Sequence, residues 1–170
     1  MAISAAVHLL RGRISGESEA RSVTRWAAWL HLALTFVLFI FWQVVSFWVN
    51  ALADLTTEGV VNESVFLLVV VTSPIWMLVR PCRAASLGMI VTAVLEAALT
   101  GACGLFFLSL SSKFPVRPGD FEEMWPLAFG AFAFAWLGMG VLSWRAFQAA
   151  NFLRRQGSAS GAALIAREFD

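Results

Sequence analysis

Residues Trp26–Asn50 read WAAWLHLALTFVLFIFWQVVSFWVN, and this stretch contains no Asp, Glu, Lys or Arg. A helix needs about 20 consecutive, predominantly apolar residues to cross the hydrocarbon core of a bilayer, so this stretch is long enough. Three more apolar stretches follow, at about Val60–Arg80, Ala84–Leu110 and Trp125–Trp144. The short alternating segments of a membrane β-barrel are not visible. The sequence therefore predicts an all-α integral membrane protein, folded as a four-helix bundle.

The composition supports the same fold class. Hydrophobic residues make up 59% of the 170 positions and charged residues 14%, whereas a typical soluble domain has about 25% charged residues. The net charge of +1 leaves no dominant basic face, which argues against a nucleic-acid partner. We expect an N-terminal cytoplasmic or interfacial segment at 1–25, one transmembrane domain at 26–150, with its last helix at about 125–150, and a C-terminal tail at 151–170.

Lys and Arg indicate the orientation of the helices. Ten of the twelve fall in segments that four spans place on one side of the membrane. The ten are Arg11, Arg13, Arg21, Arg25, Arg80, Arg83, Arg145, Arg154, Arg155 and Arg167. Cytoplasmic loops carry an excess of such residues. We therefore expect both termini on the cytoplasmic side of a multi-pass protein, or on the matrix or stromal side in an organelle.

The segments between and beyond the helices also carry predictions. Met1–Ile14 contains arginine and no acidic residue, so we expect either a retained interfacial helix or a mitochondrial targeting peptide. Ser15–Ser22 is predicted to be a polar linker, and Gly157–Gly161 a flexible joint before the end of the chain. The turn at Arg80–Arg83 is so short that the second and third helices should be antiparallel neighbours.

Glu96 lies near the middle of the third predicted helix, where an ionised carboxylate is costly. Gly88, Thr92, Glu96, Thr100 and Gly104 recur every four residues and therefore share one face of that helix. We call this face the α-ridge. Small and hydroxyl residues on such a face allow another helix to approach closely. We expect Glu96 to be protonated and buried against a neighbouring helix.

The second helix is the expected neighbour of Glu96. Pro74 has no N–H to donate to the carbonyl of Val70, which therefore loses its helical partner. Val70 and Glu96 also lie at similar depth when both are counted from the short turn. We therefore predict that the Glu96 carboxyl group donates a hydrogen bond to the Val70 carbonyl, to Thr72 or to Ser73, and so pins the two helices together.

The alternative role for Glu96 is a proton or cation site, with Gln43 or Ser46 of the first helix as partners. Transport normally needs several polar groups along a path, and the sequence reveals no such series. His31 is expected to lie at the inner membrane boundary. A transmembrane haem commonly needs two facing histidines, and only this one falls in a span. We expect no catalytic residues, no cofactor and no metal.

The fourth helix has a small face, which we expect to be a packing seam. Its members are Ala128, Ala131, Ala135 and Gly138. They alternate with Phe129, Phe132, Phe134 and Trp136. The aromatic side is predicted to face lipid or a partner, with a pigment or sterol groove as the alternative.

Tryptophan and cysteine residues are expected at the membrane boundaries. The predicted inner-boundary tryptophans are Trp26, Trp29, Trp76 and Trp144, and the outer ones are Trp48 and Trp125. Cys82 lies beside Arg80 and Arg83, so it is a candidate for palmitoylation, with an unmodified interfacial thiol as the alternative.

Two stretches resemble the MARVEL-type tetraspan proteins, the physin, gyrin and MAL group. Arg25–Phe41 (RWAAWLHLALTFVLFIF) is similar to the basic and aromatic beginning of that family's first helix. Ala128–Phe147 (AFGAFAFAWLGMGVLSWRAF) is similar to its small and aromatic fourth helix. The resemblance implies a lipid-associated membrane organiser or trafficking component without catalysis, and it transfers no functional residue.

Three functions follow as hypotheses. The first is a non-enzymatic structural or organising component that packs with membrane lipids, with other integral membrane subunits or with further copies of itself. The second is an accessory transmembrane subunit of a multi-subunit respiratory or photosynthetic complex. The third is a small oligomeric proton or ion transporter or channel that uses Glu96.

Overall fold

The computed structural model describes residue 14 and residues 16–50, 57–113 and 124–168 of the chain. Side chains are described for most of this part, namely residues 14, 16–45, 67–110 and 124–158. The described residues form four helices and no strand. The helices are α2 (Glu17–Asn50), α3 (Thr57–Val79), α4 (Arg83–Lys113) and α5 (Trp125–Glu168). The predicted all-α four-helix fold is confirmed.

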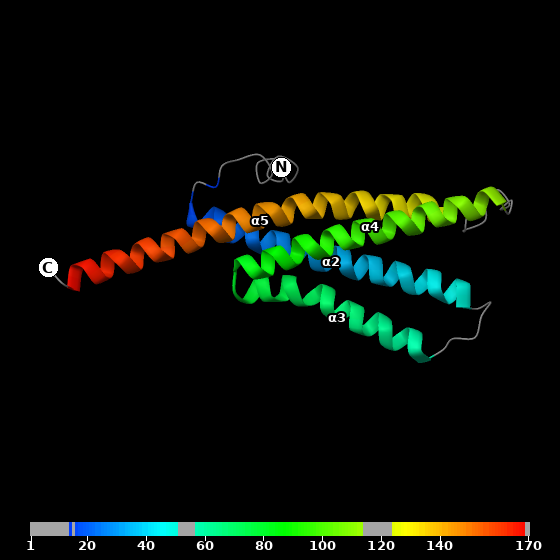
Figure 1. Cartoon of the computed structure of the whole chain (residues 1–170), viewed down its shortest axis with the longest axis horizontal. Coiled ribbons are helices and arrows are strands. Elements are labelled where there is room, and N and C mark those ends of the chain that lie inside the picture. Colours follow the sequence, from blue (N-terminus) through cyan, green and yellow to red (C-terminus); the bar gives the residue numbers. More distant parts are fainter. Residues whose placement is uncertain (1–13, 15, 51–56, 114–123, 169–170) are drawn as a thin grey trace.

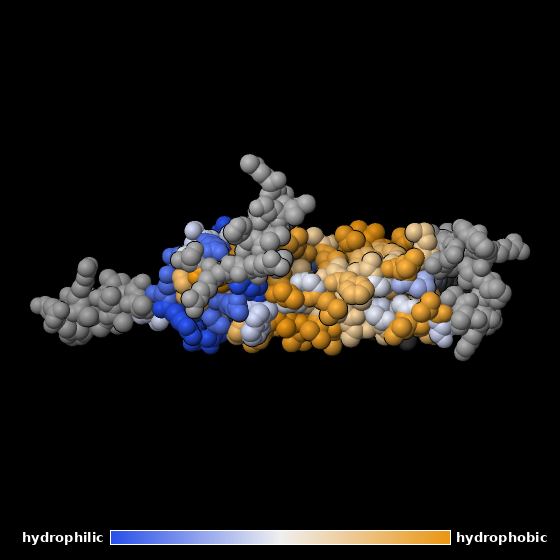
Figure 2. Space-filling model, turned by 90° about the horizontal axis from the view of Figure 1, so that it is seen from above, coloured by the Kyte–Doolittle hydropathy of each residue, from blue (hydrophilic) through white to orange (hydrophobic). Residues whose placement is uncertain are grey.

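Three of these helices are long and apolar enough to cross a membrane. Their described apolar portions are Glu17–Val45, Arg83–Leu110 and Trp125–Ser158. In α3 the described apolar portion is the shorter stretch Leu67–Val79. Figure 2 shows apolar side chains over the middle of the molecule and hydrophilic ones gathered toward one end. The chain is therefore a membrane-embedded protein.

The helices run alternately up and down along the long axis of the molecule (Figure 1). α4 and α5 pack against each other most extensively, followed by α2 with α5, α2 with α3, and α3 with α4. Each helix thus has two main neighbours around the bundle. α3 diverges from α4 toward its Thr57 end, so the bundle is tighter near the short turn than at the opposite end (Figure 1).

Local chemistry explains where two of the helices begin and end. Glu17 and Glu19 lie in the first turn of α2, where the helix dipole favours negative charge. Arg21 forms an ion pair with Glu17 one turn away. At the other boundary, α3 ends at Val79 because Pro81 disfavours a helical conformation in the residue before it.

Two segments predicted to be irregular are helical, and those predictions are wrong. α2 includes most of the predicted linker Ser15–Ser22, and α5 continues through the predicted joint Gly157–Gly161. The first extension is stabilised by packing, since Ala20 and Val23 are buried against Ala149 of α5. α5 contains 44 residues and is therefore about 66 Å long, about twice the thickness of a hydrocarbon core.

The two ends of the bundle are packed with different kinds of side chain. Near the α3–α4 turn the core consists mainly of small residues and methionine, namely Ala27, Ala28, Met77, Ala85, Met89, Ala146 and Ala150. At the opposite end it is aromatic, with Trp125 and Phe129 buried beside Val45. The Phe107 and Phe129 rings stack there at 5.4 Å. Small residues let the helices approach closely near the turn.

The packing seam predicted on α5 is not the face that packs inside the bundle. Ala131, Ala135 and Gly138 are exposed, while Phe129 and Trp136 are buried. The reason is the partner helix, because Trp136 packs against the small residues Ala93 and Ala97 of α4. A large side chain on one helix thus fills the space left by small ones on the other.

The tryptophans predicted at the membrane boundaries differ in exposure, and their depth in the membrane stays a prediction. The four residues predicted at the inner boundary, Trp26, Trp29, Trp76 and Trp144, all have exposed side chains. Trp125, predicted at the outer boundary, is buried in the bundle, with its ring centroid 4.9 Å from that of Phe107. The side chain of Trp48 and the segment Met1–Arg13 lie outside the described residues.

Candidate functional site

The α-ridge lies on the inner face of α4. Glu96 is 3% exposed, and Thr92, Thr100 and Gly104 are also buried. Gly88, nearest the short turn, is half-buried. One face of α4 therefore presents the only acidic side chain of its described apolar portion to the interior of the bundle.

The two glycines of the ridge contact two different helices. A Cβ atom added to Gly88 would lie 2.3 Å from the Ser73 hydroxyl oxygen of α3. A Cβ added to Gly104 would lie 3.3 Å from the Cβ of Phe129 on α5. The ridge therefore packs on α3 at one end and on α5 at the other, and Glu96 lies between these contacts.

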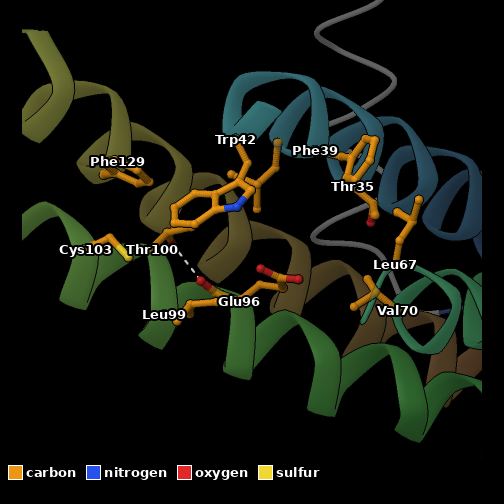
Figure 3. Close-up of a pocket in the computed structure, with 11 residues that line it drawn as sticks. Thr35, Phe39, Trp42, Leu67, Val70, Glu96, Leu99, Thr100, Cys103 and Phe129 are labelled. Carbon is orange, nitrogen blue, oxygen red and sulfur yellow. Dashed lines mark hydrogen bonds between the residues drawn. The ribbon is translucent and has the colours of Figure 1, made fainter. Parts of the chain in front are cut away.

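A cavity of about 260 Å³ occupies this middle position. Residues of all four helices line it, with Thr35 and Trp42 from α2, Val70 from α3 and Phe129 from α5. Glu96 points from α4 into the space between Trp42 and Val70 (Figure 3). The cavity is partly open, and Leu99 on its lining is 52% exposed. Its α3 lining residues, Leu67 and Val70, lie on the Thr57 side of Ser73, and α3 diverges from α4 toward Thr57 (Figure 1).

Hydroxyl groups in the cavity wall donate to their own helices. Thr100 Oγ1 donates to the Glu96 carbonyl oxygen at 2.6 Å, and Thr35 Oγ1 donates to the His31 carbonyl oxygen at 2.9 Å. Such back-bonding satisfies each hydroxyl proton locally. Each hydroxyl oxygen keeps capacity to accept a hydrogen bond.

The hydrogen bonds predicted to pin Glu96 to α3 are not formed. Among the described residues, nothing is hydrogen-bonded to the Glu96 carboxyl group. Thr72 faces away from the bundle and donates to the Leu68 carbonyl oxygen, and Ser73 packs on Gly88 instead. Val70 lines the same cavity as Glu96, which agrees with the prediction that the two residues lie at similar depth. The interhelical contact is thus made by Gly88, and the carboxyl group faces an open volume.

His31 is the residue whose position the sequence did not reveal. It was expected at the membrane boundary, but its side chain is fully buried in the bundle. Its Nε2 atom lies 3.2 Å from Thr92 Oγ1, and its ring centroid lies 5.0 Å from that of Trp136 in a T-shaped arrangement. Thr92 Oγ1 also lies 3.0 Å from the Gly88 carbonyl oxygen. If the single hydroxyl proton goes to that carbonyl, His31 must donate through Nε2–H.

A spacing rule could have identified this position. Thr24, His31 and Thr35 are seven and four residues apart, so they share one face of α2. All three side chains are buried. The same argument that grouped the α-ridge on α4 therefore also groups these polar residues on α2.

Two predicted partners of Glu96 are not part of the site as described. The side chain of Gln43 is exposed, and that of Ser46 lies outside the described side chains. Instead, the structure brings His31 of α2 to Thr92 of α4, one helical turn from Glu96. The polar groups of the described core thus form a series that the sequence alone did not indicate.

Cys82 and the question of metal binding lie apart from this cavity. The Cys82 side chain is half-buried against the core cluster that includes Met77 and Ala85, so its palmitoylation stays a prediction. Within the described part of the chain, no three His, Cys, Asp or Glu side chains are grouped as metal ligands. No family model, curated protein or solved structure matches this chain.

Proposed function

We propose that this protein is a non-enzymatic tetraspan component of a membrane, which works by packing with lipids or with other integral membrane proteins. The observation that carries the proposal is the outer face of α5. Ala131, Ala135 and Gly138 are exposed there. Phe134 and Leu127 are also largely exposed, at 78% and 76%. Small residues bordered by large apolar ones suit close contact with a further helix.

Two other features agree with such a role. α3 packs less extensively on its neighbours than α5 does, so it leaves much apolar surface for lipid or protein. α5 is also longer than a bilayer is thick, which gives a partner a surface beyond the membrane. A MARVEL-type organiser and an accessory subunit of an energy-converting complex are both forms of this proposal.

The test is native mass spectrometry of the full chain, purified in a mild detergent or directly in lipid nanodiscs. We expect the wild type to carry further copies, other membrane proteins or retained lipid. Ala135→Leu should reduce the protein–protein component, because a larger side chain prevents close helix approach. Ala102→Leu, at an exposed position on α4, is the matched control and should leave it unchanged.

The outcome separates the forms of the proposal. Stoichiometric recovery with a large complex would indicate an accessory subunit, and a lipid-rich homo-oligomer would indicate an organiser. A lipid-free monomer that Ala135→Leu does not alter would contradict both.

A second candidate function is proton or ion transport through Glu96. The observation in its favour is the buried polar series formed by His31, Thr92 and Glu96. Intramembrane ionisable groups that face a cavity often belong to a transport path. Reconstituted liposomes should then show a proton or cation flux that Glu96→Gln abolishes while the helical content and oligomeric state stay the same. Equal fluxes in wild type and variant would reject this candidate.

A further inference from the structure

The cavity around Glu96 combines a buried acid with an otherwise apolar wall. Glu96 as a whole residue is 3% exposed, and its carboxyl group has no hydrogen-bond partner among the described residues and points into the cavity (Figure 3). The lining contains no Lys, Arg or His among its described members. A buried carboxyl group without a partner is costly, and the cost is removed when a complementary group binds beside it.

The remaining oxygen atoms of the wall favour a ligand that donates hydrogen bonds. Thr35 and Thr100 already direct their hydroxyl protons to carbonyl oxygens of their own helices, so these hydroxyls can only accept. A group with several N–H bonds would match this set of acceptors better than a group with one O–H.

Aromatic side chains add a preference for positive charge. Phe39, Trp42 and Phe129 belong to the same lining, and Trp42 and Phe129 are drawn around the cavity in Figure 3. The faces of such rings attract a cation, most strongly where water is excluded. Together with the carboxyl group, they favour an ammonium ion over a neutral alcohol or an anion.

The size of the cavity limits the body of the ligand. An apolar protein cavity of about 150 Å³ holds benzene, and this cavity is about 260 Å³. It therefore suits a compact apolar group or a chain segment of about ten heavy atoms. Because the cavity is partly open beside Leu99, a longer chain can extend outward from it.

We propose that this cavity is a binding site for lipophilic amines, with Glu96 as the residue that holds the amino group. The amine enters neutral from the apolar phase as R–NH₂. The neutral Glu96 carboxylic acid transfers its proton to the amine nitrogen, which gives R–NH₃⁺ beside a carboxylate. No further reactant is required, and the new charges neutralise each other within the cavity. Binding of this kind requires neither transport nor the packing role proposed above.

The test uses the full chain in lipid nanodiscs and tritiated n-decylamine as the probe. Partitioning into lipid is measured in nanodiscs without protein and subtracted. We expect a saturable component that unlabelled decylamine displaces. Decanol, with the same chain, should displace it about tenfold less effectively, because it offers one donor and no charge. Decanoate should not displace it.

Two variants test the residue. Glu96→Gln keeps the size and polarity of the side chain but cannot form the ion pair, so it should weaken decylamine binding by about tenfold or more. Glu17→Gln is the matched control, since it removes a carboxyl group from the exposed end of α2, outside the cavity. That variant should bind as the wild type does.

Several results would overturn the proposal. These are the absence of saturable decylamine binding to the wild type, equal displacement by decanol, and unchanged binding in Glu96→Gln. If Glu96→Gln does not fold, the competition between amine, alcohol and acid on the wild type still decides the question.

Discussion

Gly88 of α4 lies against Ser73 of α3, and this is the tightest contact made by any glycine that the structure describes. A Cβ there would be 2.3 Å from Ser73 Oγ and 3.0 Å from Ser73 Cβ. Rotation of the Ser73 side chain can relieve the first contact but not the second. We expect Gly88→Val to destabilise the protein by about 1–3 kcal/mol, as overpacking does. Thermal unfolding in detergent, followed by circular dichroism, measures the change.

The matched control for this substitution is Gly140→Val on α5. An added Cβ there has nothing within 4 Å, while the change in helix propensity is the same. Equal losses of stability in the two variants would mean that the α3–α4 contact is not as close as described.

The His31–Thr92 contact can be measured by a double-mutant cycle. Thr92→Val removes the hydroxyl group at nearly constant volume, and His31→Phe keeps a ring beside Trp136. We expect a coupling energy of about 0.6 kcal/mol, a typical value for side-chain hydrogen bonds inside membranes. The coupling energy is calculated from the free energies of unfolding of the wild type, both single variants and the double variant. Strictly additive losses would show that the two side chains do not interact.

Sequence reasoning located Glu96 because an acid within an apolar stretch is conspicuous, and period-four spacing then supplied the rest of the α-ridge. It did not find His31, because a single histidine near the end of a span is equally compatible with the boundary. It also assigned Glu96 to hydrogen bonds with α3. The rotation of α3 about its own axis decides which of its hydroxyl groups faces Glu96. In the structure Thr72 faces outward and Ser73 packs against Gly88.

At the scale of elements, the side chain of Arg83 at the start of α4 contacts two residues of α5. The Arg83 Nε–H donates to Asn151 Oδ1, and the guanidinium carbon lies 5.9 Å from the centre of the Phe147 ring. We expect Arg83→Gln to speed amide hydrogen exchange in the turns of α5 around Asn151, because both contacts hold that part of the helix. Mass spectrometry of peptides from this region measures the exchange.

Arg154→Gln is the control for the same helix, since the Arg154 side chain is exposed. It removes an equal charge without removing a contact to α4. Faster exchange in both variants would indicate a general effect of charge on α5.

The existence of the four helices followed from hydrophobicity, but hydrophobicity did not indicate their inward faces, and the face of α4 was found from its polar α-ridge. Lipid is as apolar as a protein core, so an all-apolar helix carries little information about which side is inside. α5 shows the consequence, because its small face was expected to pack and Phe129 and Trp136 pack instead. The helix ends were also missed. At Ser15–Ser22, packing of Ala20 and Val23 on Ala149 overrides local propensity. At Gly157–Gly161 the described side chains are exposed, and no contact explains the helix.

At the scale of the whole molecule, the arginine distribution predicts where the ends of the chain lie. Single cysteines at Ser18, Glu122 and Ser158, each in a Cys82→Ser, Cys103→Ala background, can be labelled with a membrane-impermeant maleimide. We expect Ser18→Cys and Ser158→Cys to react from one side of the membrane and Glu122→Cys from the other. Reaction of the first two from opposite sides would exclude a topology with four spans.

The uneven lengths of the helices bear on how the protein is made. In α3, Glu63 limits the uncharged run to Ser64–Val79, which is shorter than the roughly 20 residues that span hydrocarbon alone. α4 follows after a turn of only a few residues and carries no charged residue over Ala84–Leu95. The two should therefore leave the translocon together as a helical hairpin. A nascent chain cut off at Val79 would then expose its last segment to the aqueous side, where quality-control proteases act.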